Sequence, residues 1–164
     1  MNWGGWLLIV GLVAAAGVTA LLLWRPLHGI LQDLQIERAR RAFRMERERL
    51  EAKFLDRAAA SGRPRGLRWV DCDWDHDVVF VRHRRSHQLA AFVGVTIRFE
   101  AIEGGPMEGV PAVKNLRNAT AMFHFDGIRW GTGGKALFNV NPDEAIAHYH
   151  EQFEPVPTTE GVRG

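Results

Sequence analysis

The segment VGVTIRFE, residues 93–100, alternates between two kinds of side chain. One set of positions holds Val93, Val95, Ile97 and Phe99, and the other holds Gly94, Thr96, Arg98 and Glu100. Successive side chains of a β-strand point to opposite faces of its sheet, so this alternation predicts a half-buried antiparallel strand with one face in water. We expect the whole strand to cover residues 89–100.

Other runs rich in β-branched and aromatic residues lie on both sides of this strand. They are residues 67–74, 78–82, 119–125, 128–130 and 136–140. In the first run we expect Val70, Cys72 and Trp74 to share one face. Asp126-Gly127 predicts a hairpin between two of the later runs. Together they indicate a twisted antiparallel sheet of five or six strands.

A helix is expected after the last of these runs. Asn141 suits the N-cap, Pro142 the first helical position and Glu144 the capping box. Ile146, Tyr149 and Phe153 then recur on one helical face. These elements predict an α+β domain over residues 66–156 with one helix packed on the sheet, followed by a disordered tail over residues 157–164.

The preceding segment, residues 26–65, predicts a long charged helix. Residues 37–60 are strong helix formers without Gly or Pro, and Pro26 predicts a break or a kink at Arg25. A thin apolar stripe consists of Ile36, Ala39, Phe43, Leu50 and Phe54, and Glu46 or Arg47 interrupts it. Three interpretations stay open: a solvated spacer, weak coiled-coil self-association through residues 27–55, or packing on the folded domain.

The chain opens with WGGWLLIVGLVAAAGVTALLLW, residues 3–24, which carries no charged side chain. A helix of this length crosses the roughly 30 Å hydrocarbon core of a bilayer, so residues 1–25 are predicted to form a transmembrane helix. Trp3, Trp6 and Trp24 are its expected anchors at the two interfaces. A cleaved signal peptide is the alternative, but no positively charged region precedes the apolar run.

The charge distribution predicts the orientation of this helix. Arg25, Arg38, Arg40 and Arg41 follow the apolar run and are expected to face lipid on the cytoplasmic side. The N-terminus would then lie outside the cell membrane and the C-terminal domain in the cytoplasm. Residues 25–68 hold 12 Lys and Arg against 6 Asp and Glu, whereas residues 69–164 hold 9 against 13. Few aromatic side chains accompany the basic ones, so we do not expect nucleic-acid binding.

Two groups of side chains are weak candidates for metal binding. Asp71, Asp73, Asp75 and Asp77 alternate along an extended segment and suit a hard cation. However, His76 and Arg82 stand where a calcium-binding helix–loop–helix needs Gly and Glu. Cys72, His76, His83 and His87 resemble zinc ligands in spacing, but a hairpin of residues 67–74 and 78–82 would separate them.

We find no nucleophile paired with a base and no complete phosphate loop, since residues 131–135 (GTGGK) lack the flanking residues of that motif. The sequence therefore predicts a non-enzymatic, single-pass membrane protein without a cofactor. Its cytoplasmic domain would bind or scaffold another protein. The alternative is a membrane-tethered sensor domain for a small ligand or a metal ion.

Overall fold

The computed structural model describes residues 3–61 and 64–157, and the side chains of residues 3–10, 14–16 and 19–31 are outside that description. The chain forms two compact units, one ending at Arg38 and one beginning at Ala39. The predicted disordered tail beyond Pro157 lies outside the described residues.

The first unit is helical and belongs to α1 (Trp3–Ala60). We expected a break or a kink at Arg25, and helix α1 continues through Arg25 and Pro26 without a break. A proline removes one backbone hydrogen bond and can bend a helix without ending it. Within the described residues, none of the helices is both long enough and apolar enough to cross a membrane.

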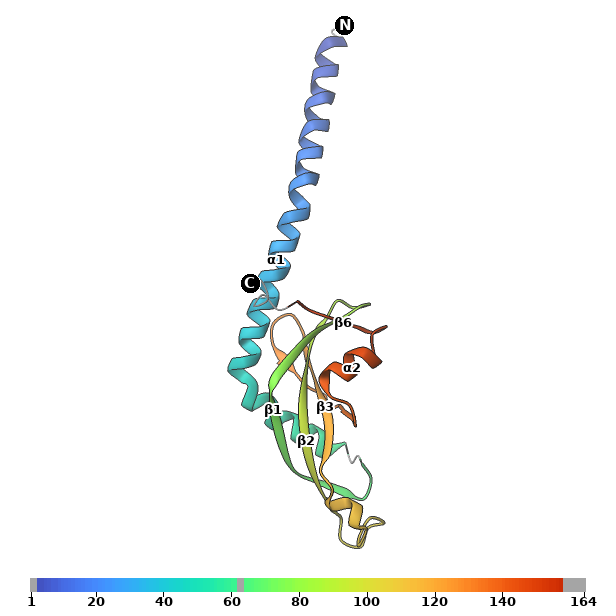
Figure 1. Ribbon diagram of the computed structural model, residues 1–164. Coiled ribbons are helices and arrows are strands. Elements are labelled where there is room, and N and C mark those ends of the chain that lie inside the picture. The colour runs from blue at the N-terminus through green and yellow to red at the C-terminus, as the bar shows by residue number, and fades with distance from the viewer. Residues whose placement is uncertain (1–2, 62–63, 158–164) are drawn as a thin grey trace, which may run out of the picture. The chain divides into compact units, whose positions relative to one another are not determined.

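The second unit contains a six-stranded antiparallel sheet, which confirms the α+β prediction (Figure 1). Its strands are β1 (Leu67–His83), β2 (Leu89–Ala101), β3 (Arg117–Phe125), β4 (Trp130–Gly131), β5 (Ala136–Phe138) and β6 (Phe153–Pro155). The strand order is β4-β3-β2-β1-β6, and β5 also pairs with β3. A short 3-10 helix, η1 (Pro111–Lys114), lies between β2 and β3.

Strand β1 replaces the two separate strands that we predicted. Its register against β2 shifts between Trp69 and Asp71 and again between Trp74 and Val78. Each shift is a β-bulge, which inserts residues without ending the strand. The first bulge also changes the alternation, so Trp69 is buried while Val70 is 39% exposed. The prediction that Val70 shares the buried face was therefore wrong.

Strand β2 has the predicted alternation only over residues 96–100, because residues 89–95 are buried on both faces, so the prediction of one face in water was wrong for the first half. Val93, Val95, Ile97 and Phe99 are all buried, whereas Arg98 and Glu100 are exposed. The same face of β3 contributes Ala119, Ala121 and Phe123 to the core. One face of the sheet is thus apolar over both central strands.

The end of the chain differs from the single helix that we expected. Helix α2 (Pro142–His148) begins with the predicted capping box between Asn141 and Glu144. It ends before Phe153, which lies in β6 and pairs with His83 of β1. Phe153 is buried against Phe92, with 5.2 Å between the ring centroids. The chain therefore turns back and adds an edge strand.

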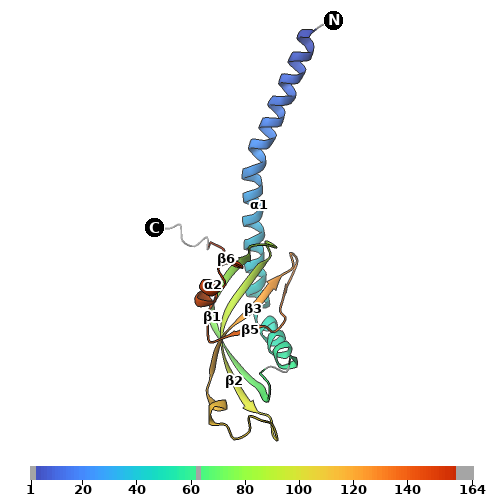
Figure 2. The ribbon, with the colours of Figure 1, turned by 90° about the vertical axis from the view of Figure 1, so that its right-hand side faces the viewer.

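The two helices cover opposite faces of the sheet. Figure 2 shows α2 on one side and the later part of α1 on the other. Ala145 of α2 packs in a cluster with Val81, Phe92 and Phe153. Ala39, Phe43, Leu50, Phe54 and Ala58 of α1 are all at most 2% exposed. Of the three interpretations of the apolar stripe, the structure supports packing on the folded domain, because from Ala39 onward the stripe is part of the domain core.

Candidate functional site

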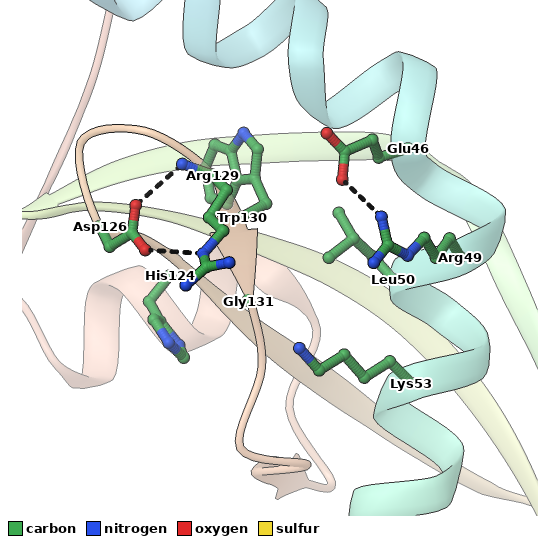
Figure 3. Close-up of a pocket in the computed structure, with 9 residues that line it drawn as sticks. All are labelled: Glu46, Arg49, Leu50, Lys53, His124, Asp126, Arg129, Trp130 and Gly131. Carbon is green, nitrogen blue, oxygen red and sulfur yellow. Dashed lines mark hydrogen bonds and ion pairs between the residues drawn. The ribbon is translucent and has the colours of Figure 1, made fainter.

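A hollow of about 440 Å³ opens between the second half of α1 and the hairpin formed by β3 and β4 (Figure 3). Its lining consists of Glu46, Arg49, Leu50, Lys53, His124, Asp126, Arg129, Trp130 and Gly131. Leu50 and Trp130 are buried, whereas the arginines, the lysine and Asp126 are exposed. We call this hollow the cationic groove, because three permanently basic side chains face two carboxylates in it.

The hairpin side of the groove is fixed by Asp126. Its Oδ1 accepts the backbone N–H groups of Ile128 and Arg129 at 2.9 and 2.8 Å, and its Oδ2 lies 3.4 Å from Arg129 Nε. The backbone hydrogen bonds, that from Arg129 first, lower the pKa of Asp126. Gly127 has a φ of +99°, which few other residues adopt, and the predicted hairpin at Asp126-Gly127 is present. Its turn is longer than predicted, because Phe125 pairs with Trp130 and residues 128–129 lie in the turn rather than in a strand.

This geometry also orients Arg129. Asp126 engages its Nε, so its two terminal nitrogens have no partner in the described part of the chain. Next to it, His124 pairs with Gly131 across β3 and β4. A Cβ atom at position 131 would lie 3.2 Å from His124 Nε2, so glycine leaves room for the ring.

The α1 side of the groove carries Arg49 and Lys53, one helical turn apart. Arg49 Nη1 lies 3.8 Å from Glu46 Oε2, and the two side chains are 84% and 40% exposed, respectively. A solvated pair of this kind contributes little, because water and salt screen it. Lys53 forms no ion pair or hydrogen bond with any described residue. The side chains of Lys53 and Arg129 extend into the groove from opposite walls (Figure 3).

Buried contacts join the two walls. The indole Nε1 of Trp130 donates a hydrogen bond of 2.7 Å to the carbonyl of Ala39. The rings of Trp130 and Phe43 pack edge to face with 5.0 Å between their centroids. The charged side chains of the groove therefore project from elements that share one core. Three of the lining side chains are basic, so the arrangement suits binding of an anion.

The acidic candidates Asp71, Asp73, Asp75 and Asp77 are exposed on β1. The Asp71 carboxylate accepts the backbone N–H of Cys72 at 2.9 Å. At the second bulge, Arg47 donates to the carbonyls of Asp75 and His76. Among the described residues, no group of three or more His, Cys, Asp or Glu side chains is arranged to hold a metal ion.

The zinc candidates lie on one strand and its turn rather than on a hairpin. His76 and His83 both belong to β1, and His87 belongs to the turn that follows. The His83 ring packs edge to face on Phe153, and its Nδ1 lies 3.1 Å from the Ser86 hydroxyl. The geometry that we expected for these ligands was therefore wrong, since β1 continues through the predicted turn.

Cys72 is half-buried on β1. Burial, and secondarily the charge of Asp71, raises the pKa of its thiol to about 12.

Because the thiolate is the nucleophile, iodoacetamide at pH 8 should alkylate native Cys72 about 10- to 100-fold more slowly than the urea-unfolded chain. Mass spectrometry measures both rates. Asp71→Asn keeps an acceptor for the Cys72 N–H and should accelerate the native reaction only modestly. Equal rates in folded and unfolded protein would contradict this account.

The predicted lipid-facing arginines divide into two groups. Arg38 and Arg41 are exposed. The side chain of Arg25 lies outside the described residues, as do those of the predicted anchors Trp3, Trp6 and Trp24. Arg40 is only 5% exposed. Its Nη2 donates to the carbonyls of Val156 and Pro157, and its guanidinium lies 5.4 Å from the ring centroid of Phe80. The prediction that Arg40 faces lipid was therefore wrong, because its side chain is buried and hydrogen-bonds the backbone of residues 156–157.

Sequence analysis did not find the groove residues Arg49, Lys53, His124 and Arg129. The four-residue spacing of Arg49 and Lys53, which we did not use, was a signal for a shared helical face, and Asp126-Gly127 predicted the turn. Their proximity follows from the packing of α1 on the sheet, for which the sequence carried no specific signal. Residues 132–135 form an irregular loop between β4 and β5, in which the Thr132 hydroxyl donates a hydrogen bond to the Met122 carbonyl.

We find no known protein family, curated protein or solved structure that matches this chain.

Proposed function

We propose that this protein is a non-enzymatic, membrane-anchored binding module. Its cationic groove would recognise a negatively charged segment of a partner protein. The observation that carries the proposal is the set of three basic side chains around one hollow, of which Lys53 has no partner among the described residues. Glu46 and Asp126 supply two negative charges against the three basic side chains, and a carboxylate or other anion of the partner would neutralise the third.

The membrane anchor is argued from the sequence of residues 3–24. An uncharged apolar helix of that length is stable in a bilayer, because it satisfies its own backbone hydrogen bonds. The basic residues that follow favour the cytoplasmic side for the domain. With this anchor, alkaline carbonate should leave the full-length protein in the membrane pellet, and its N-terminus should be uncleaved by mass spectrometry.

The volume of the groove favours a second candidate function, that of a tethered sensor for a small anionic ligand. Pockets of about 300–1,000 Å³ accommodate ligands of metabolite size, and the groove falls within that range. The two functions differ in what occupies the groove in the native membrane.

Site-specific photo-crosslinking in native membranes tests the proposal. A photoreactive residue at Met45, which is 81% exposed and one turn before Arg49, should yield a protein adduct. The same residue at Ala147, exposed on α2, is the control. The Met45 adduct should disappear when Lys53→Glu and Arg129→Glu are introduced together. Failure to form an adduct at Met45, or equal adducts at both positions, would refute a protein partner at the groove and leave the sensor function.

A further inference from the structure

We propose that the group bound in the cationic groove is a phosphorylated side chain, held between Arg129, Lys53 and Arg49. This inference depends on the proposed function, because it specifies the chemistry of the partner segment. It is drawn from the number of basic groups, from the donors left on them, and from an exposed apolar residue between two lining residues of the hairpin.

The basic side chains outnumber the oxygens of one carboxylate. A carboxylate carries one charge on two oxygens, whereas a phosphate monoester carries about 1.5 to 2 negative charges and three strong acceptor oxygens. The groove offers basic groups from two separate elements, α1 and the β3–β4 hairpin. Three such groups around one hollow match the three oxygens of a phosphate.

The donors of Arg129 suit phosphate in particular. Asp126 engages Nε and thereby orients the guanidinium, and the two terminal nitrogens remain as a fork. Such a fork binds two oxygens of a phosphate at once. Both oxygens of Asp126 are engaged by the turn itself, so this carboxylate acts as a support for Arg129.

An exposed apolar residue beside two lining residues in the sequence indicates that the phosphate is presented on a peptide. Ile128, between Asp126 and Arg129, is 89% exposed. An apolar side chain at that place can pack on a residue next to a phosphorylated one, but free phosphate cannot use it. The groove also has room for more than the anionic group alone.

Calorimetric titration of the full-length protein in phosphatidylcholine nanodiscs tests the inference. The probes are a short alanine–glycine peptide with one phosphoserine beside a leucine, the same peptide with glutamate in place of phosphoserine, inorganic phosphate, and soluble inositol bisphosphate as a lipid headgroup. We expect the phosphopeptide to bind at least tenfold more tightly than the other probes. Lys53→Glu should weaken it at least tenfold, and Ile128→Ser should weaken the phosphopeptide but not inorganic phosphate.

Lys135→Glu supplies the matched control, since it makes the same charge change at an exposed residue that does not line the groove. Equal or tighter binding of the glutamate peptide would overturn the phosphate inference and leave the proposed function intact. Tighter binding of inositol bisphosphate would overturn it in favour of a lipid headgroup. If no probe binds, or if Lys135→Glu acts like Lys53→Glu, the groove is an ordinary solvated surface and both proposals fail.

Discussion

Replacing Phe43 with alanine should lower the free energy of unfolding by about 3–5 kcal/mol, the usual cost of removing a buried phenylalanine. The Phe43 side chain is 0% exposed. Its ring packs against Phe80, Phe123 and Trp130, with centroid distances of 5.8, 5.3 and 5.0 Å. The truncation would leave a cavity between α1 and three strands of the sheet. Urea unfolding of the full-length protein in detergent, followed by near-UV circular dichroism, measures the loss.

Met45 provides the control for this substitution. It lies two residues further along the same helix and is 81% exposed, so Met45→Ala should change the unfolding free energy by less than about 0.5 kcal/mol. A solvated spacer helix would give small effects at both positions. Near-equal values for Phe43→Ala and Met45→Ala would therefore contradict the packing of α1 on the sheet.

Gly134→Ala should destabilise the domain by about 2–4 kcal/mol, for two reasons that add together. Gly134 has a φ of +72°, where a side chain strains the backbone. In addition, a Cβ atom there would lie 2.6 Å from the backbone carbonyl carbon of Arg57 and would also collide with the backbone nitrogen of Ala58. A collision with backbone cannot be relieved by rotating a side chain, so the end of α1 would have to move away from the loop.

The neighbouring glycine is a matched control for this effect. A Cβ atom at Gly133 would meet nothing within 4 Å, so Gly133→Ala should be nearly neutral in the same unfolding experiment. Hydrogen exchange adds a local measurement, because Gly134→Ala should accelerate exchange in the last turns of α1. Equal stability of the two variants would show that residues 57–58 do not contact this loop.

Features that depend on neighbours in sequence could be predicted. The alternation in β2 follows from the period of a strand, the Asn141–Glu144 cap from the unpaired N–H groups of a helix start, and the turn at Asp126 from the acceptor two residues before Ile128. In each case the interacting groups lie within a few residues of one another. Side-chain type and spacing are then sufficient.

In β1, prediction from neighbouring residues was wrong because of the β-bulges. The polar residues at 75–77 read as a turn between two strands, but they are a bulge opposite β2 with its carbonyls bonded by Arg47. Similarly, Phe153 fits a helical face in sequence but pairs with His83 in β6. The groups that stabilise both arrangements come from distant parts of the chain, and no local pattern contains them.

Local order along this chain thus specifies that there is an antiparallel sheet, a capped helix, an Asp-Gly hairpin and an apolar opening segment. Only the folded arrangement assigns the stripe of Phe43 and Phe54 to the sheet rather than to water or to a second copy. The same arrangement brings Lys53 to Arg129 across one groove. The physical reason is that an apolar stripe predicts which face of a helix is buried, but it does not predict which surface that face packs against.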